Sequence, residues 1–365
     1  MLHSPDSNAM IISRTPFRIS FFGGGTDYPS WYRTNGGQVL ATTIDKYCYI
    51  SARYLPPFFD HSFRVVYSRI ENRRRVDDIE HPAVRECLRF LEIEQGLEIH
   101  HDGDLPARSG IGSSSSFVVG LLHALHALKG TIPSKERLAE EAIHLEQIRL
   151  RETVGSQDQV LAAHGGLQRV EFLMDGEIRV TPLTLHLDRL QTLNSHLMLF
   201  FTGIRRTAAT IAQSYAGNVS AVERQLREIS GMVDDAAHIL AGGSDFTAFG
   251  RLLHETWDAK RSLSRRVSNS VVDDIYQAAR GAGAIGGKLL GAGGGGFMLL
   301  FAAPSDHARI RERLRKLVHV PFRFERGGSR IVVFDPEQDY GRETESRVAN
   351  PVEAFQEAES AVELA

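Results

Sequence analysis

The chain has 365 residues, of which 42% are hydrophobic and 24% are charged, and its formal net charge at pH 7 is −3. These values suit a globular protein of about two domains and provide no basic field to attract nucleic acid. Two cysteines cannot form a disulfide framework, and no apolar run approaches the ~20 residues that a membrane span needs. With no signal peptide visible, composition predicts a soluble, cytoplasmic, enzyme-sized protein without a nucleic-acid or membrane partner; the oligomeric state stays open.

The first region, residues 11–29, predicts two short strands broken at Pro16 and followed by a glycine turn. The turn, Gly23-Gly24-Gly25-Thr26-Asp27, lets the backbone approach a ligand closely, because glycine has no β-carbon. A carboxylate on such a turn, here Asp27, can accept hydrogen bonds from sugar hydroxyls. A plain glycine hairpin explains the same residues equally well.

Between this turn and the next glycine-rich stretch, the pattern predicts strands and one helix: strands at 38–53, 63–67 and 97–100, and a helix at 81–95. Arg73, Arg74 and Arg75 form a basic loop between the second strand and the helix. A solvated charged surface explains this loop better than a ligand site does.

A second glycine-rich stretch, Ser109-Gly110-Ile111-Gly112-Ser113-Ser114-Ser115-Ser116, leads into an apolar run at 117–125 that predicts a buried helix. The start of a helix offers N–H groups and the positive end of its dipole, and both suit phosphate. The serines add hydroxyl donors and one possible oxygen ligand for Mg²⁺. Taken alone, this stretch is better explained as a serine-rich N-cap on a core helix. Together with the two other glycine-rich stretches, however, a phosphate-binding site is the better explanation.

Two carboxylates follow this helix. Glu146 falls on the same helical stripe as Ala142 and Ile143, where a carboxylate is costly unless it is paired or binds a metal. A helix-edge glutamate that reaches water is the alternative. Asp158 lies in the first turn of a short helix predicted within 155–165, a position where any acidic residue gains from the helix dipole.

The second half of the chain predicts a hairpin, a domain boundary near 186–195, and a second α+β domain. Its elements are predicted in this order: hairpin 166–180, strand 196–201, helices 208–240, 245–264 and 270–282, a strand to 301, a helix at 305–317, and a hairpin around Gly327-Gly328. A third glycine-rich stretch, Lys288 to Gly296, forms a turn into the buried strand. The GxGxxG count over 281–286 does not predict a dinucleotide site, because a helix and not a strand precedes it.

The three glycine-rich stretches, taken together and in this order, resemble the motifs of the GHMP kinases. The matching segments are Pro16–Tyr28, Leu105–Ser114 and Lys288–Gly296. The resemblance covers residues 12–335 and implies an α+β fold of two domains with the active site in the cleft between them. The implied parts are an N-terminal ATP-binding domain like ribosomal protein S5 domain 2 at 11–190, a ferredoxin-like C-terminal domain at 191–336, and an acidic tail at 337–365.

Within this family, the sequence looks most like bacterial kinases that act on a heptose 7-phosphate. The residues behind this likeness are Phe17–Pro29, Thr42–Tyr47 and Gly155–Gln159. It implies that ATP, with Mg²⁺, phosphorylates the anomeric hydroxyl of D-glycero-D-manno-heptose 7-phosphate, giving a 1,7-bisphosphate for nucleotide-activated heptose and surface glycans. Gly-Gly-Gly replaces the Gly-Glu-His of galactokinase, which argues against galactose. Two alternatives stay open: an anomeric kinase for another sugar such as fucose, and a non-catalytic sugar or nucleotide sensor on the same fold.

The resemblance also implies roles for single residues. Asp158 is expected to take the proton from the sugar hydroxyl, and Arg18 to hold that carboxylate ionised. Ser114 and Glu146 are expected to hold Mg²⁺. The residues expected to bind the nucleotide are Pro106, Ser109, Gly110, Ile111, Gly112, Ser113, Ser114 and Ser115. Those expected to bind the sugar are Gly24, Gly25, Thr26, Asp27, Gly293 and Gly294. Cations for the distal phosphate are expected among Lys46, Arg205, Arg53, Arg206 and Lys260, with Lys46 and Arg205 preferred.

Overall fold

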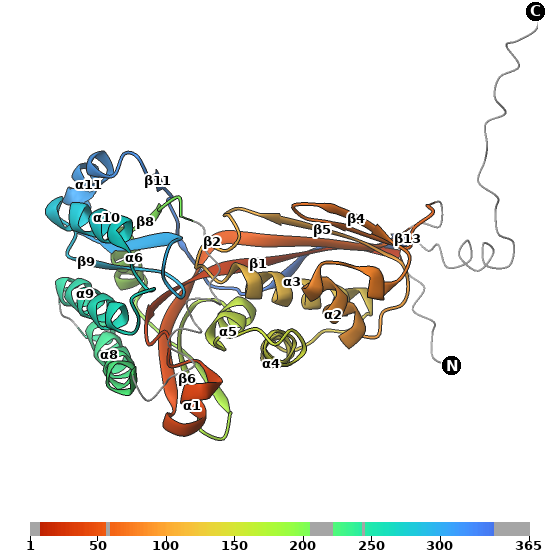
Figure 1. Ribbon diagram of the computed structural model, residues 1–365, viewed down its shortest axis with the longest axis horizontal. Helices are drawn as coiled ribbons and strands as arrows, with labels where there is room; N and C mark the ends of the chain where they lie inside the picture. The colour runs from red at the N-terminus through yellow and green to blue at the C-terminus, as the bar shows by residue number, and fades with distance from the viewer. Residues whose placement is uncertain (1–7, 56–58, 205–221, 243–244, 339–365) are drawn as a thin grey trace, which may run out of the picture.

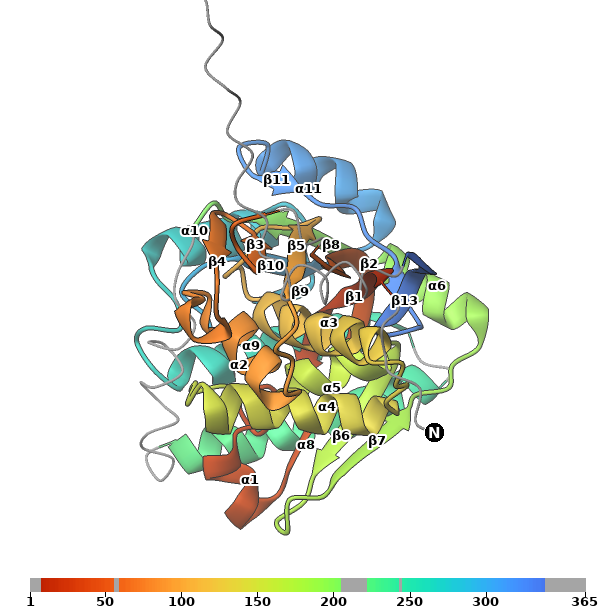
Figure 2. The same cartoon turned by 90° about the vertical axis from the view of Figure 1, so that its right-hand side faces the viewer.

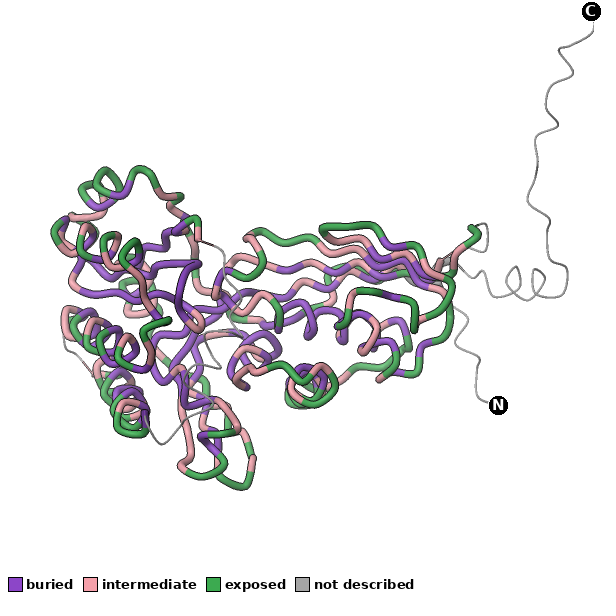
Figure 3. The backbone as a smooth tube through the Cα atoms, in the orientation of Figure 1, coloured by how far each residue is buried: buried purple, intermediate pink, exposed green. Residues whose placement is uncertain are grey.

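The structure is a computed structural model that describes residues 8–55, 59–204, 222–242 and 245–338. Over these residues the strands form two sheets, and helices pack against each (Figure 1). Buried backbone continues from one sheet into the other where they meet (Figure 3). Within the described ranges, no helix combines the length and the apolar character needed to cross a membrane.

The first sheet has the order β13-β1-β2-β5-β3-β4, and β6 and β12 also pair with β2 while β7 pairs with β6. Its pairs are antiparallel except β3 with β5. The strands are β1 (Asn8–Phe22), β2 (Gly37–Tyr54), β3 (Phe63–Val66), β4 (Ile70–Arg73), β5 (Leu97–Gly103), β6 (Leu167–Phe172), β7 (Ile178–Pro182), β12 (Phe324–Glu325) and β13 (Arg330–Gln338). The hairpin expected at 166–180 is therefore confirmed as β6 and β7.

Helices α2, α3, α4 and α5 lie on one side of this sheet (Figure 2). The helical segments of this half are α1 (Pro29–Asn35), η1 (Val76–Asp78), α2 (Pro82–Phe90), α3 (Ser113–Leu128), α4 (Lys135–His144), η2 (Leu145–Arg149) and α5 (Gln157–His164). Helix α6 (Leu187–Ser195) lies instead in the other half, where Arg189 donates to the carbonyl oxygens of Ile239 and Leu240 (Figure 1). The apolar run after the serines forms α3 as expected, and its Leu121, Leu122 and Leu125 are fully buried. This helix therefore fixes the loop at residues 109–114, called the serine loop below, against the sheet.

The second sheet has the order β11-β8-β10-β9. Its elements are β8 (Leu197–Phe201), α8 (Glu223–Ala241), α9 (Thr247–Ser262), α10 (Ser270–Gly281), β9 (Gly286–Leu289), β10 (Phe297–Phe301), η4 (Pro304–Asp306), α11 (His307–Arg313) and β11 (Val318–His319). Every residue of β10 is buried, because this strand lies between β8 and β9. A strand–helix–strand–strand–helix–strand order with this pairing is the ferredoxin-like arrangement, so that expectation is confirmed.

Two expectations about strands were wrong. Pro16 does not divide β1, since the pairing of β1 with β2 shifts register between Pro16 and Arg18 and so accommodates a residue without an N–H. Gly327-Gly328 does not form a hairpin either, because β12 pairs with β2 while β13 pairs with β1. The chain thus returns to the first sheet after β11, whereas the sequence placed these residues in the second domain. The tail from 339 and the start of the helix expected at 208–240 lie outside the described residues.

The return of the chain depends on a close approach of two glycines. Gly165, which ends α5 with φ 71°, would place an added β-carbon 1.9 Å from the amide nitrogen of Gly328. Gly130 has a similar φ of 67° but has nothing within 4 Å of that position. Gly130→Ala therefore introduces backbone strain alone, whereas Gly165→Ala combines backbone strain with a steric conflict.

We expect Gly130→Ala to lower the free energy of unfolding by ~1 kcal/mol, the cost of a left-handed residue with a β-carbon. Gly165→Ala should cost at least twice as much, because its β-carbon also pushes the β12–β13 connection away from α5. Urea unfolding of both variants measures the difference, and equal losses would show that the α5–Gly328 contact carries no stability.

Candidate active site

An ion pair joins the first strand to the start of α5. Arg18 Nε and Nη2 donate to Asp158 Oδ1 and Oδ2, each at 2.7 Å, so the pair is bidentate. The Arg18 side chain is 5% exposed and that of Asp158 is 23% exposed. Arg18 Nη1 also donates to the carbonyl oxygen of Gly110 at 2.6 Å. The structure therefore brings together the two residues expected to be catalytic and attaches them to the serine loop.

The serine loop ends in the amino terminus of α3. Gly112 occupies the N-cap with φ 75°, and no side-chain capping hydrogen bond is formed there, so no capping side chain takes the first N–H groups of the helix. A β-carbon on Gly112 would lie 3.2 Å from Arg18 Cγ and 3.4 Å from Asp158 Oδ2. Arg108 adopts φ 59°, which is uncommon for a residue with a side chain and is found at functional loops. The helix terminus therefore lies directly beside the ion pair.

The third glycine turn packs against this loop. The amide of Phe297 donates to the carbonyl oxygen of Ser109 at 3.1 Å. A β-carbon on Gly296 would lie 2.1 Å from the same oxygen, and one on Gly110 would lie 2.6 Å from the carbonyl oxygen of Leu290. Only glycine permits these approaches, because any side chain would separate the two loops.

The turn that carries Asp27 meets the other side of α5. Asp27 Oδ1 accepts from the amide of Gly25 at 2.9 Å, and Oδ2 accepts from the amide of Gln157 at 3.3 Å. Burial raises the pKa of the Asp27 carboxyl above its usual value, and the nearby charge of Asp158 adds to the effect. Thr26 Oγ1 donates to the carbonyl oxygens of Gly23 and Gln38, so its hydroxyl supports the turn from inside the fold.

Two buried lysines lie behind these loops. Lys288 Nζ donates to the carbonyl oxygen of Phe21 at 2.7 Å, which connects β9 to β1 across the two sheets. Lys260 Nζ donates to the carbonyl oxygens of Leu289 and Gly291, at the start of the third glycine turn. Burial lowers the pKa of Lys260 to about 7, with Arg18 contributing. Lys260, expected among the cations for a distal phosphate, thus supports the glycine turn, and the sequence did not single out Lys288.

Glu146 is the most fully buried carboxylate near the loop, and it lies in η2, a π-helical turn. Oε2 accepts from Ser115 Oγ at 2.8 Å and from Gln159 Nε2, whereas Oε1 has no hydrogen-bond partner among the described residues. Burial raises the pKa of this carboxyl to about 8. Such π-turns are frequent at functional sites, and sequence periodicity does not predict them.

The buried, unpartnered oxygen of Glu146 fits a divalent cation. Mg²⁺ is usually held by one or two carboxylates together with substrate phosphates, and not by a complete protein cage. In the described ranges, no group of three or more His, Cys, Asp or Glu side chains gathers to hold a metal. The hydroxyl bonded to Glu146 belongs to Ser115, and Ser114, the residue expected from the sequence, is exposed. The pairing of Ser114 with Glu146 stays a prediction.

The other expected residues are placed as follows. Gly293 and Gly294 lie in the third glycine turn, where the amide of Gly294 donates to the carbonyl oxygen of Val267 at 2.8 Å. Lys46 bonds to Asp45 of its own strand, and Arg53 pairs with Glu98 of β5. Arg205 and Arg206 lie outside the described residues. The cation for a distal phosphate is therefore not identified by these contacts.

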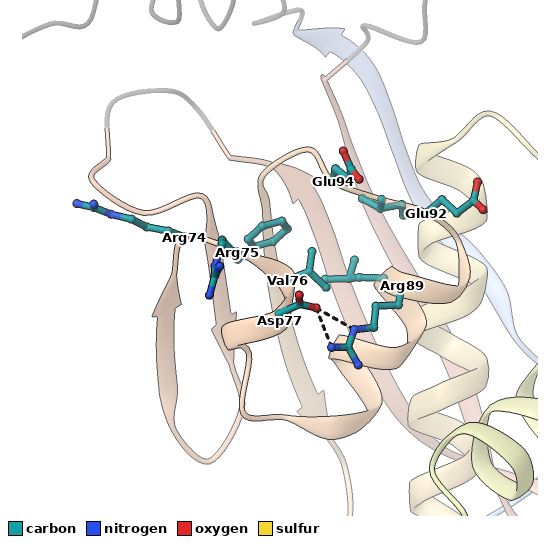
Figure 4. Close-up of a pocket in the computed structure, with 10 residues that line it drawn as sticks. Arg74, Arg75, Val76, Asp77, Arg89, Glu92 and Glu94 are labelled. Atoms are coloured by element: carbon teal, nitrogen blue, oxygen red, sulfur yellow. Dashed lines mark hydrogen bonds and ion pairs between the residues drawn. The ribbon is translucent and has the colours of Figure 1, made fainter.

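A pocket of about 440 Å³ lies elsewhere, between β3, η1 and α2 (Figure 4). Two of its three guanidinium groups are in ion pairs, since Arg89 binds Asp77 at 2.7 Å and Arg75 binds Asp78 at 2.9 Å, and Arg74 Nε donates to the carbonyl oxygen of Asp60 at 3.0 Å. None of its lining residues belongs to the serine loop, to the Gly23–Asp27 turn or to α5. This pocket is therefore separate from the Arg18–Asp158 pair and the serine loop.

Comparison with known proteins gives two family matches: the GHMP kinases N terminal domain over residues 81–166 and the GHMP kinases C terminal domain over residues 232–319. The first match includes the serine loop, Glu146 and Asp158, and the second includes Lys260 and the third glycine turn. Both matches occur in the order that the sequence motifs predicted.

Individual proteins agree with this. The D-glycero-alpha-D-manno-heptose 7-phosphate kinase of Campylobacter jejuni is 29% identical over 317 residues, which are 84% of this chain and 93% of that protein. The L-fucokinase/L-fucose-1-P guanylyltransferase of Bacteroides fragilis is 28% identical over 84% of this chain and 36% of its own length. The crystal structure of a D-glycero-D-manno-heptose 1-phosphate kinase from Bacteroides thetaiotaomicron superposes with a TM-score of 0.72 at 24% identity, covering 87% of this chain and 97% of that one.

The burial of Glu146 predicts a pH-dependent stability. Its pKa of about 8 in the folded protein exceeds the ordinary value, so the folded state loses stability as pH rises from about 4.5 through 8. Glu146→Gln removes that loss and should raise the free energy of unfolding by up to ~4 kcal/mol at pH 8, with little change at pH 4. Urea unfolding at both values measures this.

Exposed Glu140 in α4 provides the control, since Glu140→Gln should leave the pH profile unchanged. We further expect Mg²⁺ with a non-hydrolysable ATP analogue to stabilise the native chain more than it stabilises the Glu146→Gln variant. Equal stabilisation of both would remove Glu146 from the cation site.

Proposed function

Because the chain belongs to the GHMP kinase family, we propose that it transfers the γ-phosphoryl group of ATP to the anomeric hydroxyl of D-glycero-D-manno-heptose 7-phosphate. The product would be the 1,7-bisphosphate, for nucleotide-activated heptose and surface glycan synthesis. The observation that carries the proposal is the position of the Arg18–Asp158 pair, within 3.4 Å of the β-carbon position at the N-cap of α3. Phosphoryl transfer needs a bound phosphate and a base for the attacking hydroxyl in one place, and this pair meets that need.

In this proposal, the contacts of each group indicate its role in phosphoryl transfer. The N–H groups at the start of α3 and the serine loop hold the triphosphate. Asp158 accepts the proton of the sugar hydroxyl, and the bidentate contact with Arg18 fixes the direction in which its oxygens point. Glu146, with the hydroxyl of Ser115 or Ser114, would hold Mg²⁺, which neutralises charge on the phosphates when bound.

The sugar is expected on the Asp27 side of α5. Each Asp27 oxygen accepts one amide hydrogen bond, and a carboxylate oxygen has a further lone pair available for a sugar hydroxyl. Gly24, Gly25, Gly293 and Gly294 would border this space. A 7-phosphate requires a cation that these contacts do not supply, and Lys46 and Arg205 remain our candidates.

A second candidate is an anomeric kinase for fucose, favoured by the likeness to the Bacteroides fragilis fucokinase. The match to the heptose 7-phosphate kinase is preferred because it extends over 93% of that protein. A non-catalytic sensor is disfavoured, since Asp158 and Arg18 retain a complete bidentate contact beside the phosphate loop.

Release of ADP from ATP and Mg²⁺ tests the substrate. We expect turnover with the heptose 7-phosphate and a far higher KM with the unphosphorylated heptose, because the distal phosphate adds ionic contacts. Turnover with fucose alone would favour the second candidate. No ADP with any sugar, phosphorylated or free, would favour a sensor.

Asp158→Asn tests the base. The amide cannot accept the proton in the same way, so kcat should fall about 10²–10⁴-fold while the KM for ATP changes little. Asp274→Asn, an exposed change on α10, is the matched control and should retain full turnover. A loss of less than about tenfold for a folded Asp158→Asn would exclude Asp158 as the general base.

A further inference from the structure

The backbone conformation of Gly24 does not require a glycine at this position. Its φ angle is not in the left-handed region, unlike those of Gly23 and Gly25 on either side of it. A β-carbon on Gly24 would meet only Ser20 Oγ at 3.4 Å and Gln157 Nε2 at 3.7 Å, both of which are ordinary contacts. The same atom on Gly23 would lie 1.9 Å from the carbonyl oxygen of Gln38. The fold therefore demands glycine at Gly23 but not at Gly24, where the missing side chain leaves space.

Two polar groups border that space and lack partners. Ser20 is 5% exposed and Gln157 is 8% exposed. Neither Ser20 Oγ nor Gln157 Oε1 has a hydrogen-bond partner among the described residues. Buried polar atoms are rarely left in this state, because their lost hydration is not compensated. The arrangement indicates that a ligand supplies the missing hydrogen bonds.

Both groups are also aligned with the reacting centre. Ser20 lies two residues after Arg18 on β1, so the two side chains point to the same face of the strand. Gln157 directly precedes Asp158, and its amide nitrogen donates to Asp27 Oδ2 at 3.3 Å. A ligand group between Ser20 and Gln157 would therefore lie next to the two chain segments that carry Arg18 and Asp158.

The chemistry of the pair selects the kind of group. A serine hydroxyl donates and accepts, and a glutamine amide does the same through separate atoms. A neutral sugar hydroxyl, which also donates and accepts, satisfies both, whereas a phosphate or carboxylate would offer acceptors only. We propose that Ser20 and Gln157 bind a ring hydroxyl of the sugar across the space left by Gly24, and so determine which sugar is accepted. This inference rests on the proposed sugar kinase activity.

Steady-state kinetics with two side-chain variants tests the inference. Ser20→Ala and Gln157→Met should each lower kcat/KM for the sugar about 10- to 100-fold and leave the KM for ATP unchanged. With a deoxy sugar that lacks the bound hydroxyl, the native enzyme should lose at least as much, and each variant should lose little more. A deoxy series that moves the missing hydroxyl around the ring identifies the position.

Gly24→Ala fills the space without straining the backbone. It should raise the KM for the sugar at least tenfold, leave the KM for ATP unchanged and keep the native melting temperature. Gly231→Ala in α8, where nothing lies within 4 Å of the new β-carbon, is the matched control and should keep native kinetics.

The melting temperature measured without substrate distinguishes a role of Ser20 in sugar recognition from a role in stabilising the fold. Because Ser20 Oγ has no partner to lose, Ser20→Ala should not lower the melting temperature, whereas a structural serine would show a clear decrease. If the native chain phosphorylates a sugar and both side-chain variants keep its deoxy-sugar discrimination, this inference fails and the proposed function stands. If the native chain makes no ADP with any sugar, both fail.

Discussion

The ion pair between Arg18 and Asp158 is the interaction on which the site depends. It joins β1, the serine loop and the start of α5, three segments that are far apart in the sequence. Its bidentate geometry fixes both carboxylate oxygens, and the remaining guanidinium nitrogen binds the loop through Gly110. Without this pair, the serine loop and the proposed base would lose the contacts that hold them together. The glycines at Gly110 and Gly112 permit the close approach, because a β-carbon at either position would meet neighbouring atoms.

Several incompletely satisfied polar groups lie on the segments that surround this pair. Glu146 keeps one carboxylate oxygen without a partner among the described residues, as do Ser20 Oγ and Gln157 Oε1. Lys260 and Lys288 bring ammonium groups to backbone carbonyls where the sheets meet. Each of these arrangements costs stability in a ligand-free protein. Around them the fold is conventionally apolar, with α3 and β10 fully packed. The packing of this apolar core holds these polar and charged side chains in buried positions, although each would have a lower free energy in water.

The sequence was most informative where a signal is local or where short motifs combine. The core helix after the serines, the 166–180 hairpin and the buried strand at 297–301 follow from hydrophobic pattern and glycine punctuation. Three glycine motifs in order indicated the family, and through it Arg18, Asp158 and Asp27. The predictions from sequence pattern were wrong at Pro16, where the strand pairing shifts register, and at Gly327-Gly328, where the chain returns to a distant strand. Both features depend on partner strands that the local sequence does not specify. The π-turn at Glu146 was missed for the same reason.

The sequence by itself determined the composition of the site: which carboxylates, cations and glycines are available, and in what order the chain presents them. Tertiary structure alone decided which of them meet. It paired Glu146 with Ser115 and not Ser114, placed Lys260 under a glycine turn, and brought Ser20 beside Gln157 across Gly24. The physical reason is that residue identity and hydrophobic periodicity are read from neighbouring positions in the sequence. They do not specify which distant residues come into contact. Contacts between residues 31 or more positions apart, such as these, form only when the sheets and their helices pack together.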